Sequence, residues 1–344
     1  YLLSETLLLL DRMPNQSKID YNSPEAKQSR LEKYFQKTQH NVLGTKTQVN
    51  INDLIADLDA KSQHIVSHIQ KNEWINTTDG FSFFNGHYDN DGLRIHGDSD
   101  VGVQMDLTSQ VFPIMCNVAN GEQIKDIYRS IKQYLKDSDS PGLRLCTDFK
   151  QLNLNIGRIT GFTYGHKEHG SKWSQQNIML AYGLYKRGFV QEGFEIFQEL
   201  YKLSTDSNKS LIFPGIPSYF DPKNRGAYAY LTGSSTWLLL VLTTQIFGVD
   251  GYFGDLLINP KIDPSFFDAS NQATIQRKFR EINLKVVYQN TGRVAYPNFS
   301  IEKILINGNA IDTSNRAKEG VLISYDILRK NSKNDFCELQ IELI

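Results

Sequence analysis

The chain has 344 residues, and 37 Lys and Arg balance 38 Asp and Glu to give a formal net charge of −1. This balance disfavours a protein that binds chiefly to nucleic acid or to anionic lipid, because both need a basic surface. Three scattered cysteines, Cys116, Cys146 and Cys337, lack CxxC spacing, so we expect no disulfide framework, no zinc site and a reducing, cytoplasmic location.

The N-terminal region is predicted to be helical. Residues 2–13 are apolar, but Glu5, Asp11 and Arg12 interrupt them well short of the ~20 residues that span a bilayer. We therefore expect neither a membrane anchor nor a signal peptide, but a buried helix whose neighbours are not in this chain. A polar loop (14–24), an exposed helix (25–40) and an amphipathic helix (51–70) are predicted to follow.

The stretch FSFFNGHYDNDGLRIHG (81–97) alternates aromatic and polar residues around an Asp-Gly pair, a pattern that predicts a β-hairpin. Its acidic residues could suggest a calcium loop, but the Glu at the twelfth position of an EF-hand is absent. The histidines at 87, 96, 166 and 169 show no HExxH spacing. We therefore expect structural roles for these histidines, and no metal. Asp98, Asp100 and Asp106 could be carboxylates at the mouth of a barrel, but none is favoured as a proton donor.

Two pairs of helices are predicted next, each divided by a glycine: 106–119 with 122–136, and 175–187 with 190–203. Repeated helical hairpins are typical of a toroid or a solenoid, although no fixed repeat length is present.

The composition changes near residue 256. Short segments rich in β-branched residues, such as INLKVVYQ (282–289) and CELQIELI (337–344), predict an all-β region after a Pro-punctuated linker at 258–267. The predicted class is α+β, with a helical toroid portion at 1–255 and a β domain at 256–344.

Several motifs in order resemble one family. They are NEWI (72–75), FFNGHYDNDG (83–92), HKEHGSKWSQQN (166–177), FPGIPSYF (213–220), YLTGSSTWLLL (230–240) and FGVDGYFGDLLINPKI (247–262). Together they resemble the C-terminal part of inverting glycoside phosphorylases of the cellobiose phosphorylase type, most closely the branch acting on β-glucan oligosaccharides. The resemblance implies part of an (α/α)6 barrel followed by a β-sandwich-like domain. It also implies inverting phosphorolysis to α-glucose 1-phosphate, with inorganic phosphate as co-substrate and no cofactor.

The resemblance also implies binding residues. Thr232 and Gly233, at a predicted helix start, would hold phosphate, with an ordinary helix cap as the alternative. Lys167 and Glu168 would bind the sugar in the leaving-group subsite, with an exposed loop pair as the alternative. Gln175 occupies the position where the family usually has a phosphate-contacting His, and it could equally be a helix residue with no ligand.

The family's general acid lies in an Asp-Trp-Asn-Asp-like motif, which this chain lacks, as it lacks the family's phosphate-binding Arg. The sequence is therefore predicted to be the C-terminal portion of a phosphorylase, partnered by the missing N-terminal part and possible as a homodimer. The alternatives are a catalytically inactive carbohydrate-binding or scaffolding remnant and, less favoured, a helical interaction module with an exposed apolar groove.

Overall fold

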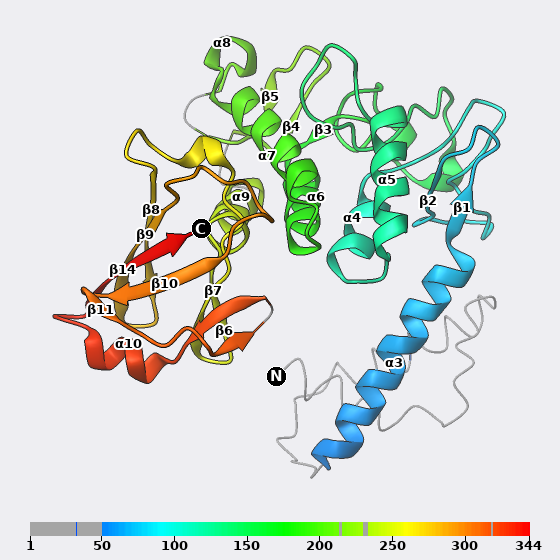
Figure 1. Ribbon diagram of the computed structural model, residues 1–344. Helices are drawn as coiled ribbons and strands as arrows, with labels where there is room; N and C mark the ends of the chain where they lie inside the picture. The colour runs from blue at the N-terminus through cyan, green and yellow to red at the C-terminus, as the bar shows by residue number, and fades with distance from the viewer. Residues whose placement is uncertain (1–31, 33–49, 213–214, 230–232, 318) are drawn as a thin grey trace. The chain divides into compact units, whose positions relative to one another are not determined.

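A computed structural model describes residue 32 and residues 50–212, 215–229, 233–317 and 319–344 (Figure 1). The chain divides into two compact units, residues 1–62 and 63–344, which are considered separately. The predicted elements at 2–13 and 14–24, and all but one residue of the helix predicted at 25–40, lie outside the described residues. Among the described residues, no helix is long and apolar enough to cross a membrane.

Helix α3 (Ile51–Asn72) confirms the helix predicted at 51–70. None of its residues is buried, and the apolar side chains that define its period are largely exposed, Ile51 by 69% and Ile65 by 56%. After α3, strand β1 (Trp74–Asn76) pairs antiparallel with β2 (Ser82–Phe84). The hairpin predicted at 81–97 is thus only partly right, since β2 pairs with the preceding strand and the later turn retains a single bridge, Tyr88 with Arg94.

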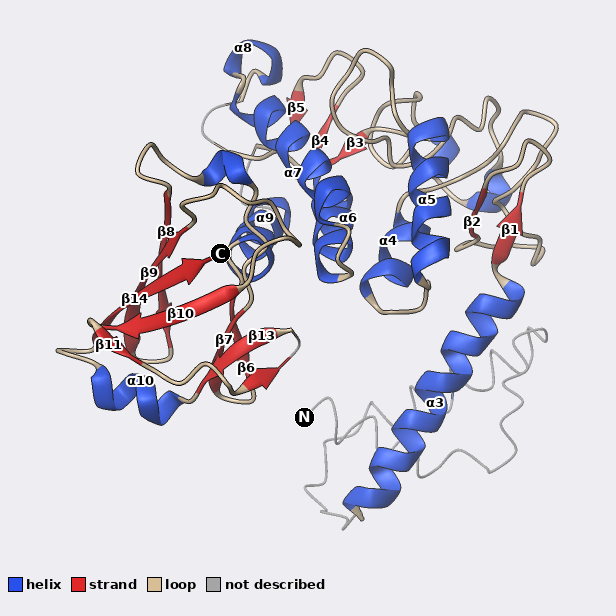
Figure 2. Cartoon of the chain, in the orientation of Figure 1, coloured by secondary structure: helices blue, strands red, loops and turns tan. Residues whose placement is uncertain are grey.

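The four paired helices are present as predicted (Figure 2): α4 (Thr108–Met115), α5 (Gly121–Tyr134), α6 (Ser174–Lys186) and α7 (Val190–Thr205). Asn120 starts α5 with a capping box, in which its side chain accepts from the Gln123 N–H and the Gln123 side chain accepts from the Asn120 N–H. Gly188, at φ +82°, allows the tight reversal between α6 and α7.

Helix α9 (Gly233–Leu240) continues into a π-helical segment, η3 (Val241–Ile246). Sheet structure begins immediately afterwards with β6 (Val249–Tyr252) and β7 (Asp255–Ile258). These strands join β13 (Gly320–Ile323) and β12 (Arg316–Ala317) in a four-stranded antiparallel sheet.

A second sheet has the order β11-β10-β14-β9-β8. Its long strands β8 (Gln272–Phe279), β9 (Ile282–Gln289) and β14 (Phe336–Leu343) have buried residues at alternate positions. The shorter members are β10 (Ile301–Ile306) and β11 (Asn309–Ala310). Within the region predicted to be all β, the segment after β13 forms helix α10 (Tyr325–Asn331), which Ser324 caps.

Buried polar contacts join the helical and sheet regions. The Tyr288 hydroxyl on β9 donates to the Phe247 carbonyl at the end of η3, and the Lys261 ammonium donates to the Tyr185 carbonyl on α6 at 2.8 Å. The chain is therefore a mixed helix and sheet protein, as the α+β prediction stated. The part of an (α/α)6 barrel and the domain boundary at residue 256 stay predictions.

Candidate functional site

Backbone hydrogen bonds align the segments that lead into three helices. Leu107, just before α4, donates to the Leu145 carbonyl at 2.8 Å, and Leu145 donates to the Ser171 carbonyl at 2.8 Å. Ser171 is followed by β3 (Lys172–Trp173), which pairs with β4 (Tyr219–Phe220). β4 in turn pairs with β5 (Gly226–Ala227), shortly before α9. The starts of α4 and α6 are therefore tied into one hydrogen-bonded array that extends to β5.

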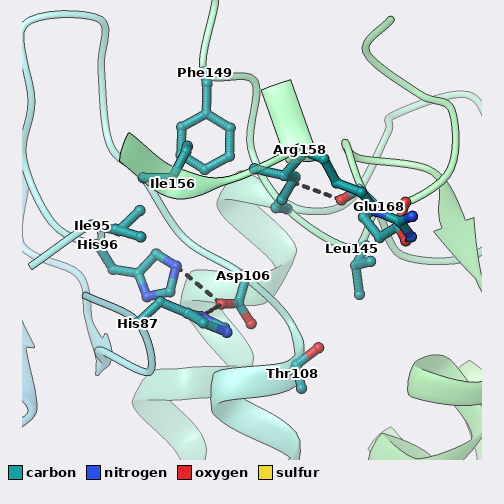
Figure 3. Close-up of a pocket in the computed structure, with 12 residues that line it drawn as sticks. His87, Ile95, His96, Asp106, Thr108, Leu145, Phe149, Ile156, Arg158 and Glu168 are labelled. Atoms are coloured by element: carbon teal, nitrogen blue, oxygen red, sulfur yellow. Dashed lines mark hydrogen bonds and ion pairs between the residues drawn. The ribbon is translucent and has the colours of Figure 1, made fainter. Parts of the chain in front are cut away.

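A cavity of about 320 Å³ opens beside this array (Figure 3). Apolar side chains form much of its wall, and ionisable groups from separate loops face one another across it. The lining consists of His87, Ile95, His96, Asp106, Thr108, Leu145, Cys146, Phe149, Ile156, Arg158, Ile159 and Glu168. Its volume lies at the lower end of the range for small-molecule sites.

Asp106 is a buried carboxylate at one side of the cavity. Its Oδ1 accepts from the Ser109 N–H at 2.7 Å, so it caps the first turn of α4, and its Oδ2 accepts from the Ser109 hydroxyl at 2.7 Å. The same Oδ2 lies 2.8 Å from His87 Nδ1 and 3.0 Å from His96 Nε2. Burial by itself would raise the pKa of Asp106, but the hydrogen bonds from His87 and His96 outweigh burial and hold the pKa well below its usual range.

A tight turn brings the two histidines together. Asp89 Oδ1 accepts from the N–H groups of Asp91 and Leu93, and the returning chain places the Ile95 N–H 3.1 Å from the His87 carbonyl. The two imidazole rings meet nearly at right angles, with centroids 5.5 Å apart.

His87 and His96 differ in exposure. The His96 side chain is 3% exposed, whereas 56% of the His87 side chain is exposed. The hydrogen bond to Asp106 raises the pKa of His87, and partial burial opposes this only in part. His87 is thus the accessible end of the cluster, and Asp106 is its fixed counter-ion.

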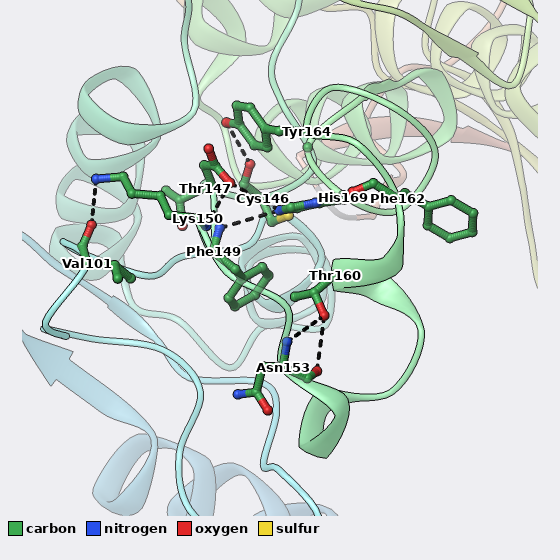
Figure 4. A network of polar contacts seen from close by, with 12 residues as sticks. Val101, Cys146, Thr147, Phe149, Lys150, Asn153, Thr160, Phe162, Tyr164 and His169 are labelled. Carbon is green, nitrogen blue, oxygen red and sulfur yellow. Dashed lines mark hydrogen bonds and ion pairs between the residues drawn. The ribbon is translucent and has the colours of Figure 1, made fainter.

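The opposite wall is the loop between residues 148 and 166, which buried His169 holds in place (Figure 4). His169 Nδ1 lies 2.7 Å from the Phe162 carbonyl and Nε2 lies 3.4 Å from the Phe149 N–H, so the neutral ring satisfies one group on each limb of the loop. The Thr160 hydroxyl accepts from the Asn153 N–H and donates to the Asn153 carbonyl, which closes the loop further.

This loop brings the Arg158 side chain next to Glu168. The guanidinium donates to Glu168 Oε1 in an ion pair. Glu168 Oε2 is buried and has no hydrogen-bond partner among the residues that the structure describes. A carboxylate oxygen in this state is unusual, since buried polar atoms are nearly always paired, and Glu168 is one of the residues that line the cavity.

The sequence-predicted residues fall into two groups. Lys167, at φ +48°, turns its ammonium over the Phe162 ring (5.1 Å) and the Tyr228 ring (5.9 Å), while its neighbour Glu168 lines the cavity. Gln175 and Gly233 lie together, because a Cβ added to Gly233 would sit 2.7 Å from Gln175 Oε1. Thr232 lies outside the described residues. The binding roles of all five remain predictions.

His87, His96 and Asp106 were expected to be structural or unassigned, yet all three line the cavity. A signal for the histidines was available in the sequence, since His87 lies four residues before Asp91 and His96 lies four residues after Gly92. In the folded-back segment His87 lies opposite Ile95, the residue before His96, so the two histidines come to adjoining positions. Nothing local in the sequence pointed to Arg158, which a long irregular loop carries to Glu168.

The sequence of this chain is similar to that of one protein family and of one curated phosphorylase. The catalytic domain of the glycosyl hydrolase 94 superfamily matches residues 34–248. A solabiose phosphorylase from Paenibacillus borealis is 22% identical over 232 residues, which are 65% of this chain and 29% of that protein. The chain thus spans less than a third of the length of this curated relative.

Solved structures of a family 92 α-mannosidase from Bacteroides thetaiotaomicron also align, at 12% identity. Without ligand, the alignment covers 69% of this chain and 24% of the mannosidase, with a TM-score of 0.23. With mannoimidazole bound, it covers 76% and 27%, with a TM-score of 0.24. At these scores nothing about the present chain follows from the likeness.

Proposed function

Because the chain belongs to the glycosyl hydrolase 94 superfamily, we propose that it is the C-terminal portion of an inverting phosphorylase that cleaves a β-linked glucose oligosaccharide with phosphate. The phosphorylase relative, matched over 29% of its length, supports the carbohydrate phosphorylase class. The β-glucan substrate, the inversion and the site residues are parts of this proposal.

The cavity is proposed as the subsite for the leaving sugar. A sugar ring presents C–H faces that suit apolar walls such as Phe149 and Ile156, and hydroxyls that need charged or polar partners at the edges. Glu168 carries the proposal, because it lines the cavity and its buried, unpartnered Oε2 would accept a sugar hydroxyl once the carboxylate turns toward the cavity. Lys167 would bind a neighbouring hydroxyl after leaving its aromatic contacts.

The Gln175–Gly233 corner is proposed as the phosphate seat, together with Thr232. Gly233 begins α9, where free backbone N–H groups and the helix dipole favour an anion. Gln175 lies beside that helix start, with its Oε1 nearest to Gly233 and its Nε2 donating to Met179 Sδ, so the amide would have to turn over to donate to an anion. Gln175 brings no charge, so the seat depends on further donors from outside the described residues.

In the proposed reaction, a phosphate oxygen forms a bond to the anomeric carbon while the bond from that carbon to the leaving oxygen breaks. A carboxylic acid protonates the leaving oxygen, and the configuration inverts to give α-glucose 1-phosphate. The acid would come from a part of the protein beyond these 344 residues. Inorganic phosphate would be the co-substrate, with no cofactor, and the N-terminal part would be the main partner.

Calorimetric titration of the chain with β-1,2-, β-1,3- and β-1,4-linked glucose disaccharides tests the subsite. Replacing Glu168 by Gln should weaken binding about tenfold or more, because a hydrogen bond to a charged group is lost. Glu122→Gln, on the exposed start of α5, is the matched control and should bind as the wild type does. Equal affinities for wild type and Glu168→Gln would contradict the proposal.

A second candidate is a carbohydrate-binding remnant without catalysis. It is favoured by Gln175 at a position where the family resemblance implies a His, and by the lack of the acid motif in this chain. Phosphate-dependent release of glucose 1-phosphate by the full-length protein distinguishes the two. Sugar binding without any phosphorolysis would favour the remnant.

A further inference from the structure

We propose that His87 is an additional sugar-binding residue of this cavity and that it accepts a sugar hydroxyl through Nε2, in a tautomer set by Asp106. This inference rests on the proposed function of the cavity. His87 lies within the motif FFNGHYDNDG (83–92), but the family resemblance assigned it no binding role.

The tautomer of His87 follows from its partner. Asp106 is an ionised carboxylate and only accepts hydrogen bonds, so His87 Nδ1, at 2.8 Å from its Oδ2, must carry the proton. Nε2 of the neutral ring is then a lone-pair acceptor. Since 56% of the His87 side chain is exposed and the residue lines the cavity, this nitrogen is available to a ligand.

His96 holds the Asp106 carboxylate in place and is not proposed to contact the sugar. Its Nδ1 accepts from the Gly86 N–H at 3.2 Å, so its proton is on Nε2 and points to Asp106 at 3.0 Å. With the Ser109 hydroxyl and N–H added, Asp106 receives four hydrogen bonds. A carboxylate satisfied in this way cannot rotate, and it holds His87 in one orientation.

The same three side chains could be taken for a metal site, since their ligand atoms lie within 4.8 Å of one another. The hydrogen bonds argue against this. A metal on His96 Nε2 would require a proton on Nδ1, which would then face the Gly86 N–H donor.

Sugar binding should therefore depend on the protonation of His87. The imidazolium cannot accept a hydrogen bond from a sugar hydroxyl. A bound sugar would also displace the water that solvates the charged ring, which disfavours the charged form. The charged and titratable groups around His87 are Asp106 and His96 beside it, and Arg158, Glu168 and Cys146 on the rest of the cavity wall. Arg158 pairs with Glu168, His96 is buried against Asp106, and burial raises the pKa of the Cys146 thiol to about 12. The exposed imidazole of the cluster is His87, whose pKa is raised by its hydrogen bond to Asp106, and we assign the pH dependence to it.

The test is calorimetric titration of the full chain with the tightest-binding β-linked glucose disaccharide between pH 5.5 and 8.5. Wild-type affinity should rise about three- to tenfold with pH as His87 loses its proton. His87→Gln keeps an amide near the Nε2 position but cannot titrate, so its affinity should not vary with pH. His64→Gln, an exposed histidine on α3, is the control and should keep the wild-type profile.

The outcomes separate the two proposals. No sugar binding by the wild type at any pH, or binding unaffected by Glu168→Gln, overturns the function proposed for the cavity. Binding that Glu168→Gln weakens, with the same pH profile in wild type and His87→Gln, overturns the role of His87 alone. Micromolar binding of Zn²⁺ to the chelator-treated chain that His87→Gln abolishes would also overturn it, because the cluster would then be a metal site.

Discussion

At the scale of single residues, buried charges in this chain are balanced by specific partners. Asp106 keeps its charge because two imidazoles and Ser109 donate to it. The Lys172 side chain is 1% exposed and donates to Asn224 Oδ1 at 2.9 Å and to the Ser140 hydroxyl, with Asp137 at 3.5 Å. Asp137 does not fully compensate burial, which lowers the pKa of Lys172 to about 8.

Lys172 gives a prediction for stability against pH. Between pH 8 and about 10.5 the unfolded chain holds this proton and the folded chain does not, so the free energy of unfolding rises with pH in that window. Lys172→Met should remove up to about 3 kcal/mol of this rise. Asp137 retains Arg144 as its partner at 2.7 Å, so the substitution leaves no isolated charge.

Urea unfolding of both proteins across this pH range is the measurement. The other lysines and tyrosines are the same in both proteins, so their contributions to the pH dependence of the free energy of unfolding cancel in the difference. Parallel pH slopes for wild type and Lys172→Met would show that Lys172 titrates normally in the folded chain.

At the scale of elements, the sequence predicted what is local and periodic. The apolar spacing and glycine stops located α4 to α7 to within a few residues, because caps and helical period are properties of adjacent positions. The hairpin was harder to predict, since β2 pairs with β1 across a turn that the aromatic alternation did not reveal. The 148–166 loop has no periodicity, so its contact with Glu168 could not be foreseen.

The capping box of α5 allows a direct test. Asn120→Ala should lower the free energy of unfolding by about 1 kcal/mol, because it removes the side-chain acceptor for the Gln123 N–H. It should also weaken the second bond of the capping box, from the Asn120 N–H to the Gln123 side chain. Lys125→Ala on the same helix removes only an exposed ion pair with Glu122 and should cost much less. Denaturant unfolding compares them, and equal losses would mean that the cap contributes nothing specific.

At the scale of the whole molecule, the helical and sheet regions meet at a constrained junction. Gly248 lies between η3 and β6 at φ +61°, and an added Cβ would sit 1.9 Å from the Asn259 carbonyl oxygen. Glycine is required there both for its backbone conformation and for its lack of a side chain. The junction directly follows α9 and η3, which form one continuous helical segment.

Gly248→Ala should therefore destabilise the chain by several kcal/mol, through steric overlap added to backbone strain. Gly254→Ala is the matched control, because Gly254 is also at positive φ, +94°, but a Cβ there would meet nothing within 4 Å. Thermal unfolding should show a much larger fall in Tm for the first variant. A similar fall in both would mean that the Asn259 backbone moves aside easily.

The family is supported across much of the chain, yet the 344 residues correspond to less than a third of the phosphorylase relative. The apolar side chains of α3 are largely exposed. The central proposal for this chain is that its cavity binds a sugar.

A crystal structure of the chain soaked with a β-linked glucose disaccharide tests that claim most directly. We expect one glucose ring between His87 and Glu168, with a hydroxyl donating to Glu168 Oε2. Sugar density elsewhere on the protein, with this cavity filled only by solvent, would contradict the account.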